Sequence, residues 1–339
     1  MNNMKRILTG DNPGGKLHLG HFVGSLENRV KLQDEYETFI ILADMHSYAY
    51  PKYISDTSIV QKGVREVLLD NLSVGLDPKK VTFFVESGIP EIYELGIVFA
   101  MLVSHNRAMR NPTIKDEIRD KGMGDSFSLG FVAFPMLQAA DILCVKADIV
   151  PVGEDQIPHI EQTNEIVRSF NKTFGTVLQE VEARVGRVKR LVGTDGNVKM
   201  TKSLDNCIYL SDSAEEVEKK VMNMYTDPTR IKATDPGHVE GNPVFIYLDA
   251  FGSEDDKLRT TNYKLLYTKG QIGDIEVKKF LVEVLNNFLA PIRKRRAEFE
   301  KDPELVERIL KEGTTKARIE AQKTLVEVKK AMKLDYFRT

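Results

Sequence analysis

Two histidines near the N-terminus, His18 and His21, are the first residues whose type and spacing point to chemistry. They follow the turn-rich segment Gly10–Gly15 and enclose Leu19 and Gly20. Residues three positions apart lie on one face of a helical turn, so both imidazoles can bind the oxygens of one phosphate. Gly20 lets a base or a ribose approach the backbone. The alternative, two surface histidines at a helix start, is disfavoured because this pattern seldom arises by chance with 6 His and 23 Gly.

A second candidate is the segment Lys199-Met200-Thr201-Lys202-Ser203, which follows the turn-rich stretch 193–197. Two lysines on a glycine-hinged loop suit a clamp that closes over phosphates as negative charge moves to a leaving group. Taken alone, the segment is better explained as a solvated basic loop. The phosphate-binding interpretation depends on its occurrence together with the two histidines.

These residues must be positioned by the elements around them, and the first 200 residues alternate between strand and helix patterns. Short β-rich runs predict strands, and apolar residues at helical spacing predict the helices between them. The strands are expected at Arg6–Leu8, Thr38–Ala43 and Val81–Val85, and the helices at Ser55–Val74, Glu91–Val103 and Glu161–Phe170. Such alternation, with few hairpin signals, predicts an α/β fold with a mostly parallel, doubly wound sheet.

From about residue 206 the pattern becomes helical. Ser213–Glu216 has the sequence of a capping box, and an apolar stripe from Val277 to Ile292 indicates a long helix. Asp302 and Pro303 are typical of the start of another helix, which we expect to reach Met332. The boundary is predicted near 204–212. We therefore expect an α/β domain over residues 1–205 and an all-helical domain over residues 206–339.

Composition sets outer limits on the function. The 339 residues are 42% hydrophobic and 29% charged, which indicates a globular chain with a sizeable core. The apolar runs are too short for a membrane span, and the N-terminus lacks the apolar core of a signal peptide. Cys144 and Cys207 lie outside any metal or disulfide motif, which favours a reducing cytoplasm and predicts no protein-bound metal. The formal charge of −2 argues against a generally basic nucleic-acid binder.

Together, the two motifs resemble those of class I aminoacyl-tRNA synthetases. The intervening segments are similar in order and spacing to those of tryptophanyl-tRNA synthetases, and they comprise Asp44–His46, Phe134–Leu143, Asp148–Gln156 and His159–Glu161. The resemblance spans essentially the whole chain. It implies a Rossmann-like, HUP-type catalytic domain, followed by a helical anticodon-binding domain whose last helices pack back on the catalytic domain.

Several positions depart from the commoner bacterial pattern, and their combination resembles the second, divergent bacterial tryptophanyl form. The commoner pattern has Thr-x-Gly-Asn in place of residues 18–21, Met in place of Gln138, and Ser or Thr in place of Gly14 and Thr201. Gly14 lacks the hydroxyl that Ser or Thr would supply at that position. Gln138 is a residue type that tyrosyl enzymes use beside the amino acid, so tyrosine stays an alternative substrate.

The resemblance implies a two-step reaction. The tryptophan carboxylate attacks the ATP α-phosphate and releases pyrophosphate, and the tryptophanyl group then passes to the 3′ end of tRNA(Trp). The family further implies a cytoplasmic homodimer and Mg²⁺ carried mainly by the ATP phosphates and water. Positioning and electrostatic stabilisation are expected to supply the catalysis.

The resemblance also assigns residues. The catalytic set is His18, His21, Lys199 and Lys202, all expected on the phosphates. The ATP site adds Asn12, Pro13, Gly14, Gly20, Gly153, Glu154, Asp155, Leu191, Met200, Thr201 and Ser203. Within it, Asp155 is expected to bind the ribose and Leu191 the adenine. The alternative for Asp155 is a simple acid at a helix N-terminus.

The tryptophan site is expected to contain His46, Gln138, Asp141 and Gln156. Asp141 is the only acid in the apolar stretch Phe131–Val145. A carboxylate in such a setting suits the indole N–H, a donor with no acceptor face. His46 and Gln156 are assigned to the carboxylate and ammonium ends of the amino acid. The alternatives are a structural histidine at position 46 and an Asp141 that pairs with a basic side chain or faces water.

Three other functions stay open at this point. Gln138 is compatible with a tyrosyl ligase. The chain does not show the aromatic-rich N-terminal segment or the appended RNA-binding domain familiar in those enzymes. A non-catalytic paralogue would have no need for both motifs, and another nucleotidyltransferase of this fold would have no use for the helical half. The basic run Arg293–Arg296 fits either tRNA phosphates or a solvated helix face.

Overall fold

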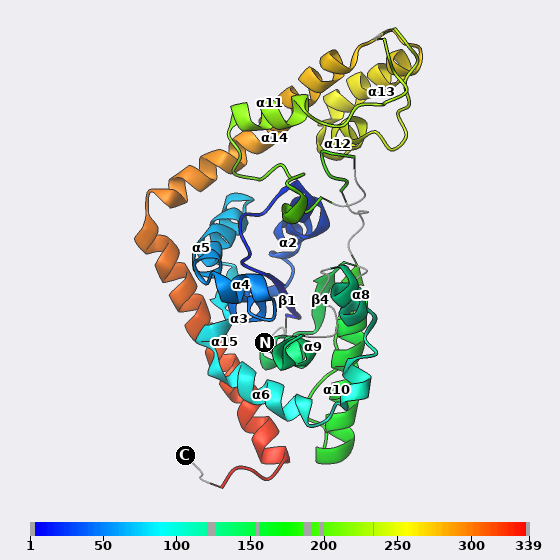
Figure 1. Cartoon of the computed structure of the whole chain (residues 1–339). Helices are drawn as coiled ribbons and strands as arrows, with labels where there is room; N and C mark the ends of the chain where they lie inside the picture. The colour runs from blue at the N-terminus through cyan, green and yellow to red at the C-terminus, as the bar shows by residue number, and fades with distance from the viewer. Residues whose placement is uncertain are drawn as a thin grey trace.

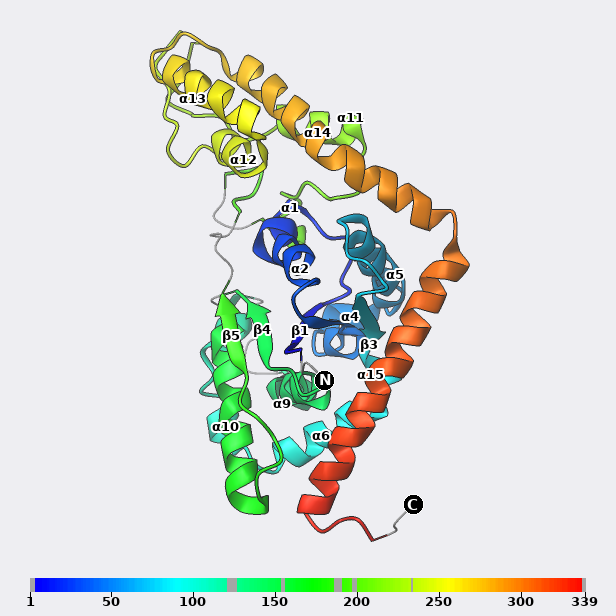
Figure 2. The same ribbon diagram turned by 180° about the vertical axis from the view of Figure 1, so that it is seen from behind.

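The computed structural model describes residues 4–120, 127–153, 156–185, 191–196, 200–232 and 234–336, without the side chains of Asp120 and Ser203. The molecule is elongated, with a sheet-containing body at one end and a helical arm at the other (Figure 1). Turned by 180°, it shows one long helix running the length of the body on its outer side (Figure 2). No helix in the described ranges is long and apolar enough to cross a membrane.

The body is built on a sheet of five parallel strands in the order β3-β2-β1-β4-β5. The strands are β1 (Arg6–Asp11), β2 (Glu37–Leu42), β3 (Val81–Val85), β4 (Ile149–Val152) and β5 (Glu182–Val185). The chain moves outward from β1 in one direction and then returns to its other side at β4. Ligands of open parallel sheets bind at such a point, outside the carboxyl ends of the strands. The predicted doubly wound α/β fold is confirmed.

The two faces of the sheet pack into two separate cores, because successive side chains of a strand point to opposite faces. Ile40, Leu42 and Phe83 belong to a core that extends into the helical half of the molecule. Leu8, Ile41 and Phe84 belong to the opposite core, under α6 (Pro90–Ala100), α9 (Leu129–Cys144) and α10 (Ile157–Phe174). The remaining helices of the body are α1 (Leu19–His21), α2 (Glu27–Leu32), α3 (Asp44–Ser47), α4 (Pro51–Ser55), α5 (Ser58–Ser73), α7 (His105–Ala108) and α8 (Pro112–Asp120).

The helical arm begins where the capping box predicts. The Ser213 side chain accepts a hydrogen bond from the Glu216 N–H at 3.1 Å, and the Glu216 carboxylate accepts one from the Ser213 N–H at 2.7 Å. The helices that follow are α11 (Ala214–Met222), α12 (Pro243–Phe251), α13 (Glu254–Thr268), α14 (Asp274–Glu300) and α15 (Pro303–Ala331). Asp302 caps α15 as expected, since its side chain accepts from the Leu305 N–H at 2.9 Å.

Helix α15 turns back and packs along the edge strand β3 (Figure 2). The Thr314 hydroxyl accepts a hydrogen bond from the Val85 N–H at 3.2 Å. A Cβ at Gly313 would lie 1.9 Å from the Phe83 carbonyl oxygen, so only glycine permits this approach. Covering the strand with a helix removes an exposed sheet edge.

Some local expectations differ from the structure. The predicted helix Ser55–Val74 corresponds to α5, which begins three residues later at Ser58, and the preceding short helix α4 was not predicted. After α1 the backbone forms a π-helical turn over Phe22–Leu26 before α2 begins. The predicted helix Glu91–Val103 ends at Ala100. In each case the apolar spacing located the helix, and local hydrogen bonding set its ends.

Candidate active site

The segment after β1 holds the two histidines together. The His18 N–H donates to His21 Nδ1 at 3.1 Å, and the ring centroids lie 3.8 Å apart. On either side the backbone is fixed, because the Leu17 N–H donates to Asp70 Oδ2 at 2.7 Å and the Leu19 N–H donates to the Ile208 carbonyl at 3.0 Å. The imidazoles therefore form one unit beside the carboxyl end of the sheet.

The second motif meets the first although 180 residues separate them. Met200 Sδ lies 3.4 Å from the Gly20 amide nitrogen. A Cβ at Gly20 would lie 3.0 Å from the His18 ring and 3.4 Å from Met200 Sδ, so the glycine permits this close packing. The Met200 N–H in turn donates to the Leu191 carbonyl at 3.1 Å, and Leu191 is buried. The structure thus brings residues from both predicted motifs to one place.

Lys202 points from the second motif toward the glycine turn that follows β1. Its Nζ donates to the Gly15 carbonyl at 2.7 Å, and Gly15 has a φ of +120°, which favours glycine. Burial lowers the pKa of Lys202 to about 8. An ammonium group that is largely removed from water and faces a backbone carbonyl is well placed to meet an anion. The adjacent Thr201 N–H donates to Asn206 Oδ1 at 2.8 Å, which fixes the loop.

Residues 12–14 line the same turn. Asn12 Oδ1 accepts a hydrogen bond from the Ser47 hydroxyl at 3.0 Å. A Cβ at Gly14 would lie 2.1 Å from the hydroxyl oxygen of Tyr53, so that hydroxyl fills the space a side chain would need. Tyr53 was not among the predicted residues. It comes from α4, a short helix that was not predicted from the sequence.

Pro13 is packed against helix α5 through a glycine. A Cβ at Gly63 would lie 1.7 Å from the Pro13 carbonyl oxygen. Position 63 must therefore lack a side chain for the turn to sit this close to the helix. Gly63 is a second residue with a role in shaping the site that the sequence did not single out.

The predicted amino-acid residues His46 and Asp141 also lie together. His46 Nδ1 is 3.4 Å from Asp141 Oδ2 and 3.6 Å from Oε1 of Glu86. Asp141 is 3% exposed and Glu86 is fully buried. Two carboxylates thus share one imidazole in a dry environment. Glu86 was missed, although an acid directly after a buried strand is a recognisable signal for the carboxyl end of a parallel sheet.

The electrostatics of this cluster follow from burial and like charge. The two carboxylates raise the pKa of His46 to about 10 against the opposing effect of burial. Burial and the nearby Glu86 raise the pKa of Asp141 to about 7, although His46 acts in the opposite direction. Within the described ranges, these three residues form the grouping whose donor atoms approach one another closely enough to hold a metal ion. A protonated imidazole between two carboxylates accounts for the same geometry without an ion.

The other predicted residues are placed as follows. Gln138 lies on α9 three residues before Asp141 and is half-buried, so both are on one face of the helix. Gln156 is half-buried at the start of α10, and its N–H donates to the carbonyl of the exposed Gly153 at 3.0 Å. Glu154, Asp155 and Lys199 lie outside the described residues, as does the side chain of Ser203.

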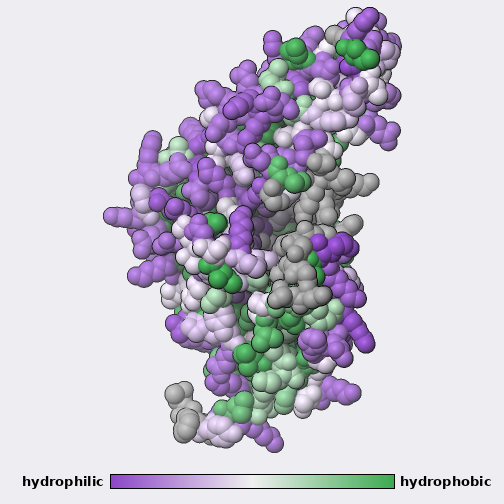
Figure 3. Space-filling view, viewed as in Figure 1, coloured by the Kyte–Doolittle hydropathy of each residue, from purple (hydrophilic) through white to green (hydrophobic). Residues whose placement is uncertain are grey.

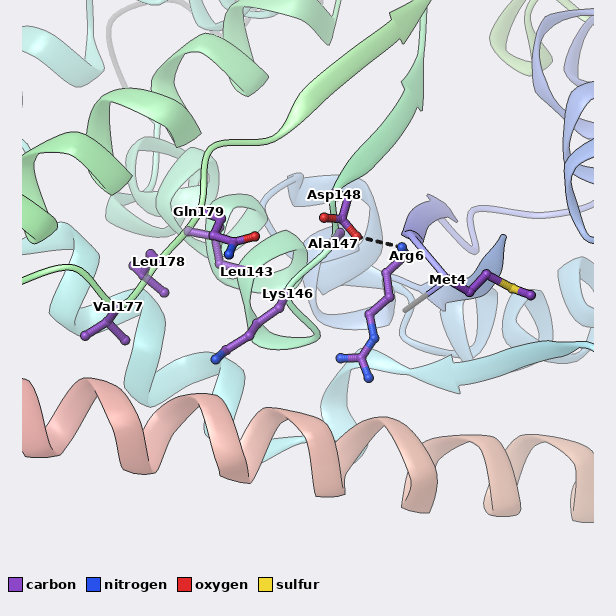
Figure 4. A pocket seen from close by; sticks show the side chains of 9 residues that line it. All are labelled: Met4, Arg6, Leu143, Lys146, Ala147, Asp148, Val177, Leu178 and Gln179. Atoms are coloured by element: carbon purple, nitrogen blue, oxygen red, sulfur yellow. Dashed lines mark hydrogen bonds between the residues drawn. The ribbon is translucent and has the colours of Figure 1, made fainter. Parts of the chain in front are cut away.

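A cavity of about 210 Å³ lies away from these residues, near the amino ends of β1 and β4 (Figure 4). Arg6 and Lys146 line it, but Arg6 pairs with Glu37 and Lys146 with Glu327. Its cations are therefore already neutralised. The cavity lies at the opposite end of the strands from both motifs.

The basic run on α14 is used largely inside the protein. Arg296 is 6% exposed and pairs with Asp70 at 2.5 Å and with Glu66 at 2.6 Å. Arg295 Nε donates to the Ser73 carbonyl at 2.6 Å, and Arg293 binds Asn286 Oδ1 at 2.7 Å. Three of its four residues therefore form contacts within the protein, a role that neither of the two interpretations had predicted, and only Lys294 of the four is exposed.

Comparison with known proteins identifies relatives over the full length of the fold. The family model for class I tRNA synthetases (W and Y) matches residues 2–290. The chain is 52% identical over 337 residues to a tryptophan–tRNA ligase of Streptococcus pyogenes serotype M3, covering 98% of each chain. It is equally similar to the tryptophan–tRNA ligase of Streptococcus mutans serotype c, at 52% over 337 residues and 98% of each chain.

Among solved structures, the tryptophanyl-tRNA synthetase from Campylobacter jejuni, complexed with ADP and tryptophan, superposes with a TM-score of 0.84. The two chains are 31% identical, and the match covers 97% of this chain and 99% of the other. The two-part architecture described above is therefore shared with an enzyme whose structure has been solved.

Proposed function

Since the chain belongs to the class I tRNA synthetases of the tryptophan and tyrosine family, we propose that it is a tryptophan–tRNA ligase. Two observations support this proposal: the contact of Gly20 with Met200, and the buried carboxylate of Asp141. We propose that the first belongs to a phosphate-binding set and that the second accepts the indole N–H. The names of the relatives at 52% identity support the same substrate.

In the proposed reaction, tryptophan and ATP form tryptophanyl-adenylate. A carboxylate oxygen of tryptophan forms a bond to the α-phosphorus, and the bond to the bridging oxygen breaks, so that pyrophosphate leaves with the electron pair. Lys202 is placed to stabilise the charge that develops on pyrophosphate, with His18 and His21 on the phosphate oxygens. Lys199, Glu154 and Asp155 are proposed to complete the ATP site, on the strength of their motifs alone. In the second step, a hydroxyl of the terminal ribose of the tRNA attacks the acyl carbon and displaces AMP.

Mg²⁺ is proposed to enter with ATP and to be held by phosphate oxygens and water. The described carboxylates nearest the turn are already engaged, since Asp11 pairs with Arg29 at 2.6 Å and Asp70 pairs with Arg296. The residues around the turn therefore fit a metal that arrives on its phosphates better than a metal held by protein carboxylates. The ADP in the C. jejuni structure supports a nucleotide at this site.

The domain assignment extends the proposal to tRNA. We propose that residues 1–205 catalyse both steps and that the arm over residues 206–339 binds the anticodon. The arm projects from the body, while α14 and α15 tie it to β3 and α5 (Figure 1). Charging of tRNA(Trp) with a substituted anticodon is expected to fall strongly, while pyrophosphate exchange without tRNA stays at its native rate. Equal charging of both tRNAs would contradict the role of the arm.

We further propose that the enzyme acts in the cytoplasm as a homodimer. Ile97 and Met101 lie one helical turn apart near the end of α6 and are 61% and 79% exposed. Apolar surface gathers over the region of α6 and α9 (Figure 3). Sedimentation is expected to give a dimer mass for the native protein and a monomer mass for Met101→Glu. A native monomer would contradict the expectation.

Pyrophosphate exchange into ATP, measured with each of the twenty amino acids, tests the central proposal. We expect exchange with tryptophan and little with any other amino acid. Exchange with tyrosine alone would identify the tyrosyl alternative. Absence of exchange with all twenty, from a folded protein that binds ATP, would indicate a non-catalytic paralogue.

A further inference from the structure

Glu86 is a buried carboxylate that neither motif accounts for. It follows β3 in a short 3₁₀ turn, Glu86–Gly88, and its Oε2 accepts the His46 N–H at 3.0 Å. Its Oε1 lies 3.6 Å from His46 Nδ1 and has no hydrogen-bond partner within the described part of the chain. Glu86 therefore fixes the backbone of His46 and also faces its ring.

Asp141 approaches the same ring from α9. Its Oδ2 lies 3.4 Å from His46 Nδ1, whereas Oδ1 is buried and has no hydrogen-bond partner among the described residues. Only one oxygen of Asp141 is therefore engaged by His46. The other is a buried acceptor, and burying such an atom without a donor is costly. It is an oxygen that a substrate donor would satisfy.

The other groups near the His46 ring are either engaged elsewhere or apolar. Asp44 lies on the same short helix as His46. Its carboxylate accepts a hydrogen bond from the Ser87 N–H at 2.9 Å and another from the Ser87 hydroxyl at 2.5 Å. Phe134 packs edge-on against the imidazole, with ring centroids 5.6 Å apart. Glu86 Oε1 and Asp141 Oδ1 are buried without a hydrogen-bond partner among the described residues, and such oxygens favour a ligand that donates a hydrogen bond.

We propose that Glu86 is a positioning residue for tryptophan, which holds His46 so that His46 engages one oxygen of Asp141 and leaves the other for the indole N–H. This inference rests on the proposed function and assigns the chain's selectivity to three residues instead of Asp141 alone. It also explains why a buried glutamate is tolerated beside a second carboxylate.

The test compares tryptophan with 3-benzothienylalanine, in which sulfur replaces the indole N–H. A site built around one hydrogen bond discriminates strongly against an analogue that lacks the donor. In Glu86→Gln, the carboxylate that faces the His46 ring is lost, so His46 is held less firmly against Asp141. We expect the KM for tryptophan in pyrophosphate exchange to rise roughly 10- to 100-fold. The KM for ATP and the KM for benzothienylalanine should change less than about threefold. The KM ratio, defined as the KM for benzothienylalanine divided by the KM for tryptophan, therefore decreases.

Two further variants separate positioning from general damage. Glu91→Gln is the matched control, because Glu91 is also a buried glutamate but pairs with Arg318 at 3.1 Å and Gln322 at 3.0 Å. The Glu91→Gln variant should keep the native KM ratio between the two amino acids. In the double variant Glu86→Gln/Asp141→Asn, we expect about the same ratio as in Asp141→Asn alone, since Glu86 acts through Asp141.

Several outcomes would overturn the proposal. One is a Glu86→Gln protein with the native KM ratio. Another is an equal rise in KM for both amino acids, which would mean that Glu86 only shapes the pocket. A stoichiometric metal ion that is lost in Asp141→Asn would replace it with a metal site. If Glu86→Gln does not fold, His46→Asn breaks the same link and must narrow the ratio. Absence of tryptophan-dependent exchange in the native enzyme would refute the proposed function itself.

Discussion

Two buried acidic clusters flank the candidate active site, and they are satisfied in opposite ways. Asp11 accepts two hydrogen bonds from the Arg29 guanidinium, at 2.6 and 3.0 Å, and a third from Asn71 at 3.0 Å. Asp70 accepts from the Leu17 N–H and from Arg296. Across the site, Glu86 and Asp141 share the single imidazole of His46.

The difference separates carboxylates whose oxygens are engaged within the protein from carboxylates that we propose to meet a ligand. Arg29 helps hold the pKa of Asp11 below its usual value against the effect of burial. Asp141 has only the imidazole of His46, which it shares with Glu86, and burial raises its pKa to about 7. Fully paired carboxylates fix the end of β1 and the segment before His18. Partly paired carboxylates keep a buried acceptor, which we propose for the substrate, at a cost in stability that the unliganded protein carries.

The largest effect is expected on the paired side, from Arg296→Met. The substitution leaves Asp70 buried without its counter-charge, and breaking one partner of a buried ion pair typically costs about 3–5 kcal/mol. Denaturant unfolding should show this loss in the free energy of unfolding. The exposed neighbour gives the control, since Lys294→Met should stay within about 0.5 kcal/mol of the native value. A native-like Arg296→Met would mean that Asp70 is satisfied in another way.

Lys202→Ala should have the next largest effect, on rate. Lys202 is a half-buried cation whose Nζ donates to the neutral carbonyl of Gly15, so its charge is available for a leaving pyrophosphate. Loss of one transition-state charge contact is worth about 2.7–4 kcal/mol, or roughly 10²–10³ in rate. We expect kcat for pyrophosphate exchange to fall by this factor, with a small change in the KM for tryptophan. Native exchange kinetics would show that the loop is only a solvated turn.

Asp141→Ala removes the acceptor on the partly paired side. We expect the KM for tryptophan to rise by roughly 10- to 100-fold, about 1.4–3 kcal/mol, because the indole N–H is then left without a partner. The KM for ATP should stay nearly native, since the nucleotide residues lie on other elements. Pyrophosphate exchange with varied tryptophan and varied ATP measures both. An unaffected variant, or equal native exchange with tyrosine and tryptophan, would refute the assignment of Asp141.

The smallest effect is a pH dependence of stability in the unliganded protein. The pKa of Asp141 rises on folding from 3.8 to about 7, so the folded state binds more protons in that window and its stability decreases as pH rises. His46, with a pKa raised from 6.5 to about 10, contributes stability that is present below 6.5 and lost through 10. Unfolding at pH 5 and pH 7 should give a smaller difference for Asp141→Asn than for the native protein. An identical difference would contradict the raised pKa.

The sequence by itself determined the elements and the order of the motifs. Strand Val81–Val85 was predicted at its observed bounds, and the capping residues Ser213 and Asp302 marked the starts of α11 and α15. Such features are encoded within a few neighbouring residues, through side-chain periodicity and local hydrogen bonds. The histidine pair and Lys202 were found in the same way, as short motifs with a chemical purpose. The roles of Lys199, Glu154 and Asp155 stay predictions.

Only the tertiary structure decided which charges meet. Arg296 pairs with Asp70, which is 226 residues away in the sequence. This residue of the basic run therefore forms an ion pair inside the protein instead of a contact with nucleic acid. Glu86 joins His46 across 40 residues, and Tyr53 fills the space beside Gly14. A buried ionic contact depends on where packed elements place two side chains, and no local pattern carries that information. The sequence therefore identified the residues that we propose to act on ATP, whereas packing determined which of the described carboxylates keep an oxygen without a hydrogen-bond partner.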